Sequence, residues 1–194
     1  TGERAVVSVN ATGVTGLGPA AGWLGDATAL LVDGHHLDAG VSLAQAARVA
    51  GVPVLLDGGS WKPGLESLLA VVDHAVLSAD FHLPDAPGLP DVPGLPTLPD
   101  LLAAVAALGP STVAVSAGAG PIHVLTGGRE TRVEPPVVDD VVDTLGAGDV
   151  LHGGTGAALA RGASITDALA AGARVASESV RHPGALGWVT APRR

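Results

Sequence analysis

The feature that most constrains this fold is a regular alternation between short apolar runs and longer segments rich in Ala and Leu. The apolar runs predict strands over 5–9, 29–32, 52–56 and 75–77. The segments between them predict helices over 20–24, 41–50 and 63–71. Because the strand candidates are apolar almost throughout, we expect an α/β fold with a mostly parallel sheet and helices on both faces.

The second half of the chain continues this pattern with one change of direction. A helix is expected over 98–108 and a strand over 112–116. Two short strands, 121–125 and 131–133, flank Gly127-Gly128 and predict a hairpin. Two further helices are expected over 150–161 and 166–181, the second ended by Pro183 and Gly184. With 194 residues, the chain is long enough for one domain.

A Pro-rich segment over 83–99 separates the two halves. Six prolines recur at every third position, which is the period of a polyproline II helix. One interpretation is a docking strip for an aromatic-lined groove, and the other is a loop insertion. The loop is favoured because the basic residues that usually flank such docking strips are absent.

Polar residues follow three of the predicted strands. Asp33, Asp57 and Ser78 each stand where a strand ends. In parallel α/β sheets the ligand crevice lies outside the carboxyl ends of the strands, so these residues are site candidates. Ordinary turn chemistry explains each of them equally well.

The stretch from Asp143 to Asp149 reads Asp-Thr-Leu-Gly-Ala-Gly-Asp. Gly146, Ala147 and Gly148 can turn the chain so that successive amides point into one concavity, and a helix starting there adds its positive dipole end. This combination predicts an anion cradle. Asp149 would then lie beside the anion, where a carboxylate is useful as a general base. The alternative is that Asp149 only caps the helix.

This stretch resembles the D-T-x-G-A-G-D signature of the ribokinase (PfkB) family of carbohydrate kinases, and the resemblance extends over about 29–189. It implies a ribokinase-like fold and ATP-dependent phosphorylation of a hydroxyl on a sugar or sugar-like alcohol. On this interpretation Asp149 is the base, and the amides of Gly146, Ala147 and Gly148 form the anion hole.

The resemblance also implies a nucleotide site and its ions. The loop Ser116-Ala-Gly118-Ala-Gly120 is similar to the family's T-x-G-x-x-G, with its second Gly one residue early. Thr144 would also contact the nucleotide, and the last helix would wall the adenine pocket through Ala173, Ala176 and Ser177. Asp143 would help to hold a monovalent cation such as K⁺. The family's N-x-x-E, which serves Mg²⁺ and phosphate, is replaced by Ser78-Ala-Asp-Phe81.

From the resemblance we expect the chain to lack the family's N-terminal portion, which would carry the lid and most sugar contacts. A phosphoryl-transfer site without them is expected to be slow or inactive. Homodimer formation is expected only where that lid is present. The acceptor therefore stays open among sugars, sugar acids and nucleosides.

Composition excludes several other classes. The formal net charge of −9, with ten basic residues, argues against a nucleic-acid partner. The absence of Cys rules out disulfides and thiol catalysis. No apolar run has the length of a membrane span, and a cytoplasmic location is expected.

Two alternatives to a kinase remain at this stage. Residues 16–21 fit G-x-G-x-x-A between a strand and a helix, the outline of a dinucleotide-binding site. A non-catalytic nucleotide-binding module is the other, suggested by the altered 78–81 stretch. Lys62, the sole Lys, is interpreted as a solvated residue rather than a phosphate ligand, and His152 as a packing residue rather than a catalytic one.

Overall fold

A computed structural model describes residues 17–18, 20–84 and 97–190. The strands are β1 (Leu30–Asp33), β2 (Val54–Gly58), β3 (His74–Ser78), β4 (Thr112–Ser116), β5 (Ile122–Thr126) and β6 (Arg129–Val133). The α-helices are α1 (Leu37–Ala50), α2 (Leu65–Leu69), α3 (Leu98–Ala106), α4 (Ala147–Leu159), α5 (Ile165–Ser179) and α6 (Gly187–Thr190). A 3₁₀ helix, η1 (Ala21–Trp23), precedes them.

The six strands form one sheet in their order along the chain, β1-β2-β3-β4-β5-β6. The first four strands are parallel, and the β5–β6 hairpin is antiparallel to β4 and within itself. The expected α/β fold with a mostly parallel sheet is therefore confirmed, and so is the hairpin around Gly127-Gly128.

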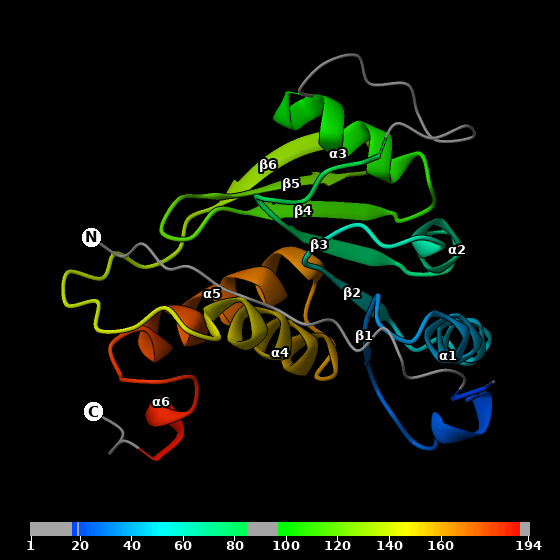
Figure 1. The fold of residues 1–194 in the computed structure, drawn as a ribbon, viewed down its shortest axis with the longest axis horizontal. Coiled ribbons are helices and arrows are strands. Elements are labelled where there is room, and N and C mark those ends of the chain that lie inside the picture. The colour runs from blue at the N-terminus through cyan, green and yellow to red at the C-terminus, as the bar shows by residue number, and fades with distance from the viewer. Residues whose placement is uncertain (1–16, 19, 85–96, 191–194) are drawn as a thin grey trace.

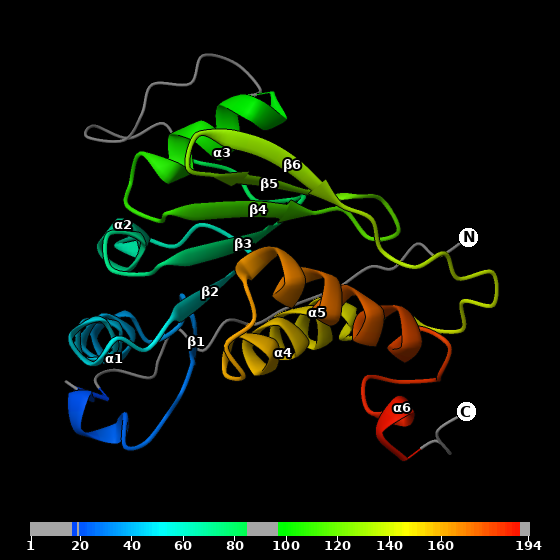
Figure 2. The same ribbon diagram turned by 180° about the vertical axis from the view of Figure 1, so that it is seen from behind.

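Helices cover both faces of this sheet (Figures 1 and 2). The crossover helices α1, α2 and α3 all pack on one face, because successive right-handed crossovers in one direction place their helices on the same side. The opposite face is covered by α4 and α5. The chain thus enters the second helical layer only after the last strand.

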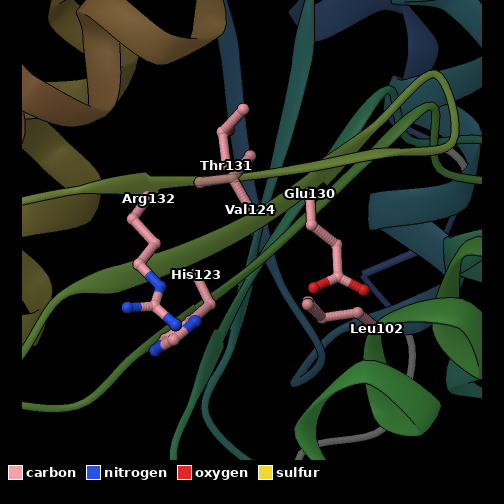
Figure 3. Close-up of a pocket in the computed structure, with 6 residues that line it drawn as sticks. All are labelled: Leu102, His123, Val124, Glu130, Thr131 and Arg132. Carbon is pink, nitrogen blue, oxygen red and sulfur yellow. The ribbon is translucent and has the colours of Figure 1, made fainter.

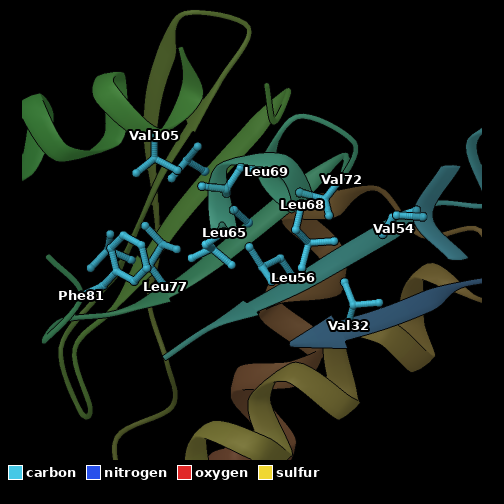
Figure 4. Close-up of a cluster of buried hydrophobic side chains, with 14 of the residues drawn as sticks. Val32, Val54, Leu56, Leu65, Leu68, Leu69, Val72, Leu77, Phe81 and Val105 are labelled. Carbon is cyan, nitrogen blue, oxygen red and sulfur yellow. The ribbon is translucent and has the colours of Figure 1, made fainter. Parts of the chain in front are cut away.

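Successive side chains along each parallel strand point alternately to the two faces of the sheet. In β2, Val54 and Leu56 pack with the crossover helices, whereas Leu55 packs with α4 and α5. The crossover side forms the larger core, with fully buried Leu65, Leu68, Leu69 and Phe81 (Figure 4). Strands buried on both faces explain why their sequence is apolar throughout rather than alternating.

Helices α4 and α5 pack closely because each has a glycine at the contact. A Cβ placed on Gly172 would lie 2.4 Å from Thr155 Oγ1 and 2.5 Å from the Leu151 carbonyl oxygen. A Cβ on Gly154 would lie 2.9 Å from Gly172 Cα. Gly154 in α4 and Gly172 in α5 are therefore required by packing, despite the helix propensity that each glycine costs.

Several predicted boundaries are wrong. The helix expected over 41–50 begins at Leu37, because Leu37 extends the apolar stripe of Val41 and Ala44 by one turn. The helix expected over 63–71 spans only Leu65–Leu69, since Gly64 has φ +89° at its N-cap. Pro99 lies in the first turn of α3 rather than in the Pro-rich loop, because Thr97 and Asp100 form a capping box there.

Two predictions lie outside the described residues: the strand over 5–9 and most of the Pro-rich segment, 85–96. Among the residues that are described, no helix has both the length and the apolar character needed to cross a bilayer.

Candidate active site

The carboxyl ends of the four parallel strands meet at one edge of the sheet. Asp33 and Asp57 are direct neighbours in the β1–β2 register. Ser78 and Ser116 are neighbours in the β3–β4 register. The sheet therefore brings together the polar residues that the sequence predicted at strand ends, as expected for parallel neighbours.

Helix α4 begins close to the same edge. Its N-cap, Gly146, has φ +76°, and a Cβ there would lie 3.0 Å from the Ala185 side chain. Both observations require glycine at this position. The first-turn amides of Gly148 and Asp149 have no acceptor one turn back within the helix, so α4 offers donors and a positive dipole end to an anion.

The predicted anion hole needs one correction. The Ala147 amide donates to the Thr144 carbonyl at 3.2 Å, which closes the turn before α4. The Ala147 amide is thus already bonded, and the amides of Gly148 and Asp149 are the donors that α4 offers to an anion.

Asp149 lies in the first turn of α4 with an exposed side chain. Its negative charge raises the pKa of Asp57, as does the negative charge of Asp33. Three carboxylates from α4, β2 and β1 therefore share one region of the sheet edge. Lys62 is half-buried, and its positive charge lowers the pKa of Asp57. It therefore lies near these carboxylates and is not a fully solvated residue.

Asp57 is the most perturbed acid of this group. Burial raises the pKa of the Asp57 carboxyl, and the negative charges of Asp149 and Asp33 add to the effect. His152 and Lys62 act in the opposite direction, since their positive charges lower this pKa. Asp57 Oδ2 lies 3.4 Å from His152 Nδ1.

His152 makes more contacts than a packing residue needs. It is 5% exposed, and its Nδ1 lies 2.7 Å from the Gly148 carbonyl oxygen. Its Nε2 lies 3.0 Å from the Val76 carbonyl oxygen in β3. The position of a histidine one turn after Gly148 is visible in the sequence, but nothing in the spacing indicates its partners on the sheet.

Asp143 holds the loop that leads into α4. Its Oδ1 accepts a hydrogen bond from the Leu145 amide at 2.9 Å, and its Oδ2 accepts one from the Gly184 amide at 2.8 Å. The adjoining amides of Val142 and Asp143 both donate to the Val180 carbonyl. The segment after α5 is thereby tied to the start of α4. The cation role of Asp143 stays a prediction.

The loop after β4 lies at the same sheet edge. Ser116 Oγ donates to the Leu77 carbonyl at 3.3 Å, so in this structure its hydroxyl is turned toward β3. Gly118 has φ +57° and is exposed, and the Gly120 amide closes a turn to the Ala117 carbonyl. Their nucleotide contacts stay predictions.

The three predicted wall residues of α5 differ in accessibility. Ala173 is 3% exposed and packs in the core against the sheet, which makes it a poor candidate for direct ligand contact. Ala176 and Ser177 are half-buried, and Ser177 Oγ donates to the Pro136 carbonyl at 3.3 Å. Ser177 thus lies beside the loop that enters α4.

The stretch in place of N-x-x-E does not supply a metal ligand at its fourth position. Phe81 is 1% exposed and packs edge-on against Trp61, with ring centroids 6.3 Å apart. Asp80 is exposed, and its amide donates to Ser78 Oγ. In the described part of the chain, no group of three His, Asp or Glu side chains is placed to hold a metal ion.

A separate pocket of about 240 Å³ lies between α3 and the hairpin (Figure 3). The side chains of His123, Arg132, Glu130 and Leu102 point to one side of the hairpin, and Thr131 points to the other. This pocket lies on strands beyond the parallel part of the sheet and contains none of the predicted site residues.

Comparison with known proteins decides the family. The family described as pfkB family carbohydrate kinase matches residues 21–190, which is most of the chain. This chain belongs to the PfkB family. The resemblance carried by Asp143–Asp149 is thereby confirmed.

Solved structures show the same ribokinase-like fold. Arabidopsis thaliana ribokinase, complexed with ribose and ATP, is 27% identical with a TM-score of 0.66, and the match covers 81% of this chain and 51% of that one. Aminoimidazole riboside kinase from Salmonella enterica, complexed with aminoimidazole riboside and an ATP analogue, is 24% identical with a TM-score of 0.67, and covers 84% and 59%. A provisionally assigned ribokinase II from E. coli, with ATP and Mg²⁺, is 19% identical with a TM-score of 0.64, and covers 86% and 56%. This PfkB chain therefore spans little more than half of the length of these relatives.

Proposed function

We propose that this PfkB chain carries the nucleotide-binding and catalytic-base half of an ATP-dependent kinase for a sugar or sugar-like alcohol. The observation that carries the proposal is the start of α4, where a glycine N-cap, unpaired first-turn amides and Asp149 lie at the carboxyl edge of the parallel strands. The complex of Arabidopsis thaliana ribokinase with ribose and ATP supports the choice of nucleotide.

The proposed reaction is an in-line phosphoryl transfer. The acceptor oxygen forms a bond to the γ-phosphorus of ATP while the bond between that phosphorus and the bridging oxygen of ADP breaks. Asp149 takes the proton of the attacking hydroxyl, and the amides at the start of α4 stabilise the negative charge on the phosphoryl oxygens. ADP leaves with the electron pair of the broken bond.

Mg²⁺ is proposed to enter with ATP. Because Phe81 is buried where the family has Glu, the described residues offer no preformed magnesium cage. Mg²⁺ commonly keeps several waters and binds through substrate phosphates, so the proposal does not depend on a cage of protein ligands. A K⁺ site near Asp143 is proposed on the family resemblance alone.

The first test is calorimetric titration of the 194-residue chain with Mg-ADP, with NAD as the control ligand. Saturable binding of ADP without binding of NAD is the expected result. The dinucleotide-binding alternative is not favoured, because residues 21–23 form only one turn of 3₁₀ helix where that site needs a full helix. Binding of NAD instead of ADP would reverse this choice.

Replacing the proposed base provides the second test. Asp149→Asn should lower phosphoryl transfer by roughly 10²–10⁴-fold while leaving Mg-ADP affinity almost unchanged. The matched control is Asp167→Asn, because Asp167 occupies the first turn of α5, away from the cradle. Equal effects of the two substitutions would mean that Asp149 only caps its helix.

A non-catalytic nucleotide-binding module is the second candidate, and the burial of Phe81 favours it. This candidate predicts ADP binding with no ATP turnover for any acceptor. Phosphorylation of even one sugar, lost in Asp149→Asn, would eliminate it.

A further inference from the structure

His152 lies where three parts of the molecule meet. It stands on α4, one turn after Gly148, and its ring reaches the Val76 carbonyl in β3 and the Asp57 carboxylate in β2. The ring is almost completely buried. It is thus a direct polar connection between the start of α4 and the middle of the sheet.

Both ring nitrogens face oxygen atoms that can only accept hydrogen bonds. Nδ1 is 2.7 Å from the Gly148 carbonyl oxygen, and Nε2 is 3.0 Å from the Val76 carbonyl oxygen. Each contact is favourable only when that nitrogen carries a hydrogen, since a bare nitrogen would oppose a lone pair to a lone pair. The arrangement therefore fits an imidazolium, and Asp57 supplies the negative charge beside Nδ1.

The bond to Gly148 has a particular consequence for the cradle. The Gly148 carbonyl and the Asp149 amide belong to the same planar peptide unit. Holding the carbonyl oxygen therefore fixes the direction of the Asp149 N–H and the position of the Asp149 Cα. Through His152, the position of this peptide is fixed relative to β3 as well as to its own helix.

We propose that His152 is a positioning residue that fixes the Gly148–Asp149 peptide against the sheet and neutralises Asp57. The role of Asp149 as a base rests on the proposed kinase function. The position of the Gly148–Asp149 peptide does not depend on that function. We expect His152 to affect nucleotide binding through the position of this peptide and not through direct contact with substrate or nucleotide.

The surrounding charges show why a cation is needed there. Asp57 faces Asp149 from α4 and Asp33 from β1, and the cations acting on it are His152 and Lys62. Without His152, Lys62 would be the remaining cation acting on Asp57 among three carboxylates. Removal of the ring should therefore raise the pKa of Asp57 further and disturb the first turn of α4.

The ring itself can be tested without any ligand. In a chain labelled with ¹⁵N-histidine, His152→Gln identifies the His152 signals by their loss. We expect two ring N–H signals from His152, one for each of its two carbonyl contacts. A single ring N–H signal in the unaltered chain would overturn the proposal.

The positioning role is tested by the backbone amides. His152→Gln should shift the amide signal of Asp149, and the Asp57 carboxyl should titrate at higher pH. The matched control, His123→Gln, changes a half-buried histidine on the hairpin and should leave both unchanged. An unshifted Asp149 amide in a folded His152→Gln chain would contradict the proposal.

Nucleotide binding separates this inference from the kinase proposal. Mg-ADP affinity should fall about tenfold in His152→Gln and stay unchanged in His123→Gln. If the unaltered chain binds no ADP while the ring and amide signals behave as expected, the kinase proposal fails and the positioning role stands. If ADP binds equally well to the unaltered chain and to His152→Gln, the positioning role is wrong.

Discussion

At the scale of single residues, Asp57 makes stability depend on pH. Burial raises its pKa in the folded chain above the ordinary value of 3.8, so the folded state holds this proton to higher pH than the unfolded state does. The free energy of unfolding contributed by Asp57 is therefore greatest below pH 3.8 and falls as the pH rises through the folded pKa.

This prediction is measured as a difference between two chains. The free energy of unfolding of the unaltered chain minus that of Asp57→Asn, from denaturant titrations between pH 4 and 7, should decrease with rising pH. A difference that increases with pH would mean that the charge of His152 outweighs burial at this carboxyl.

Some residues of the candidate site could be predicted from their neighbours in the sequence, and others could not. The positions of Asp149 and Gly146 at the start of α4 could be predicted because the signature places them on one turn. His152 was interpreted as a packing residue because two of its partners, Asp57 and Val76, lie 95 and 76 positions earlier in the chain. Ala173 was assigned to a ligand wall, and its burial against the sheet could not be read from the helix alone.

At the scale of helices, the contact between α4 and α5 depends on Gly172. Gly172→Ala should lower the free energy of unfolding by about 1–3 kcal/mol, because its Cβ would overlap Thr155 Oγ1 and the Leu151 carbonyl and push the helices apart. Denaturant unfolding followed by circular dichroism measures this change.

Gly156→Ala is the control for helix propensity. A Cβ on Gly156 meets no atom within 4 Å, so this substitution in α4 should stabilise the chain by roughly 0.5–1 kcal/mol. Stabilisation by both substitutions would show that α4 and α5 do not need the close approach seen here.

Strands and helices were predicted well where local pattern decides them and less well at their ends. The strand over 112–116 and the hairpin follow directly from apolar runs and paired glycines. The start of α1 was placed one turn late, although Leu37 continues its apolar stripe. The length of α2 was overestimated because the left-handed conformation of Gly64 appears only in the folded chain.

At the scale of the whole molecule, ligand binding should stabilise the folded chain. Mg-ADP at about 100 times its dissociation constant should add roughly 2.7 kcal/mol, seen as a rise in the thermal unfolding midpoint. Asp149→Asn should keep this rise, because the proposed base is not needed for nucleotide binding.

Gly146→Ala should lose the rise, since φ +76° and the Ala185 contact leave no room for a Cβ at the cradle. Gly162→Ala is matched to it, because Gly162 has φ +82° but no atom within 4 Å of a Cβ. Both variants carry a similar backbone strain, so only Gly146→Ala should lose the response to ADP. An ADP response retained in Gly146→Ala would argue against the cradle.

Local patterns along the chain are sufficient to predict the class of fold, the order of most elements and the family. These properties come from hydrophobic period, turn residues and one contiguous stretch, all of which are local in the chain. Only the packed structure shows that the crossover helices share one face, that Phe81 is buried in the core, and that His152 joins α4 to β2 and β3. These features depend on contacts between residues that are far apart in the sequence, and a local sequence pattern does not reveal such contacts.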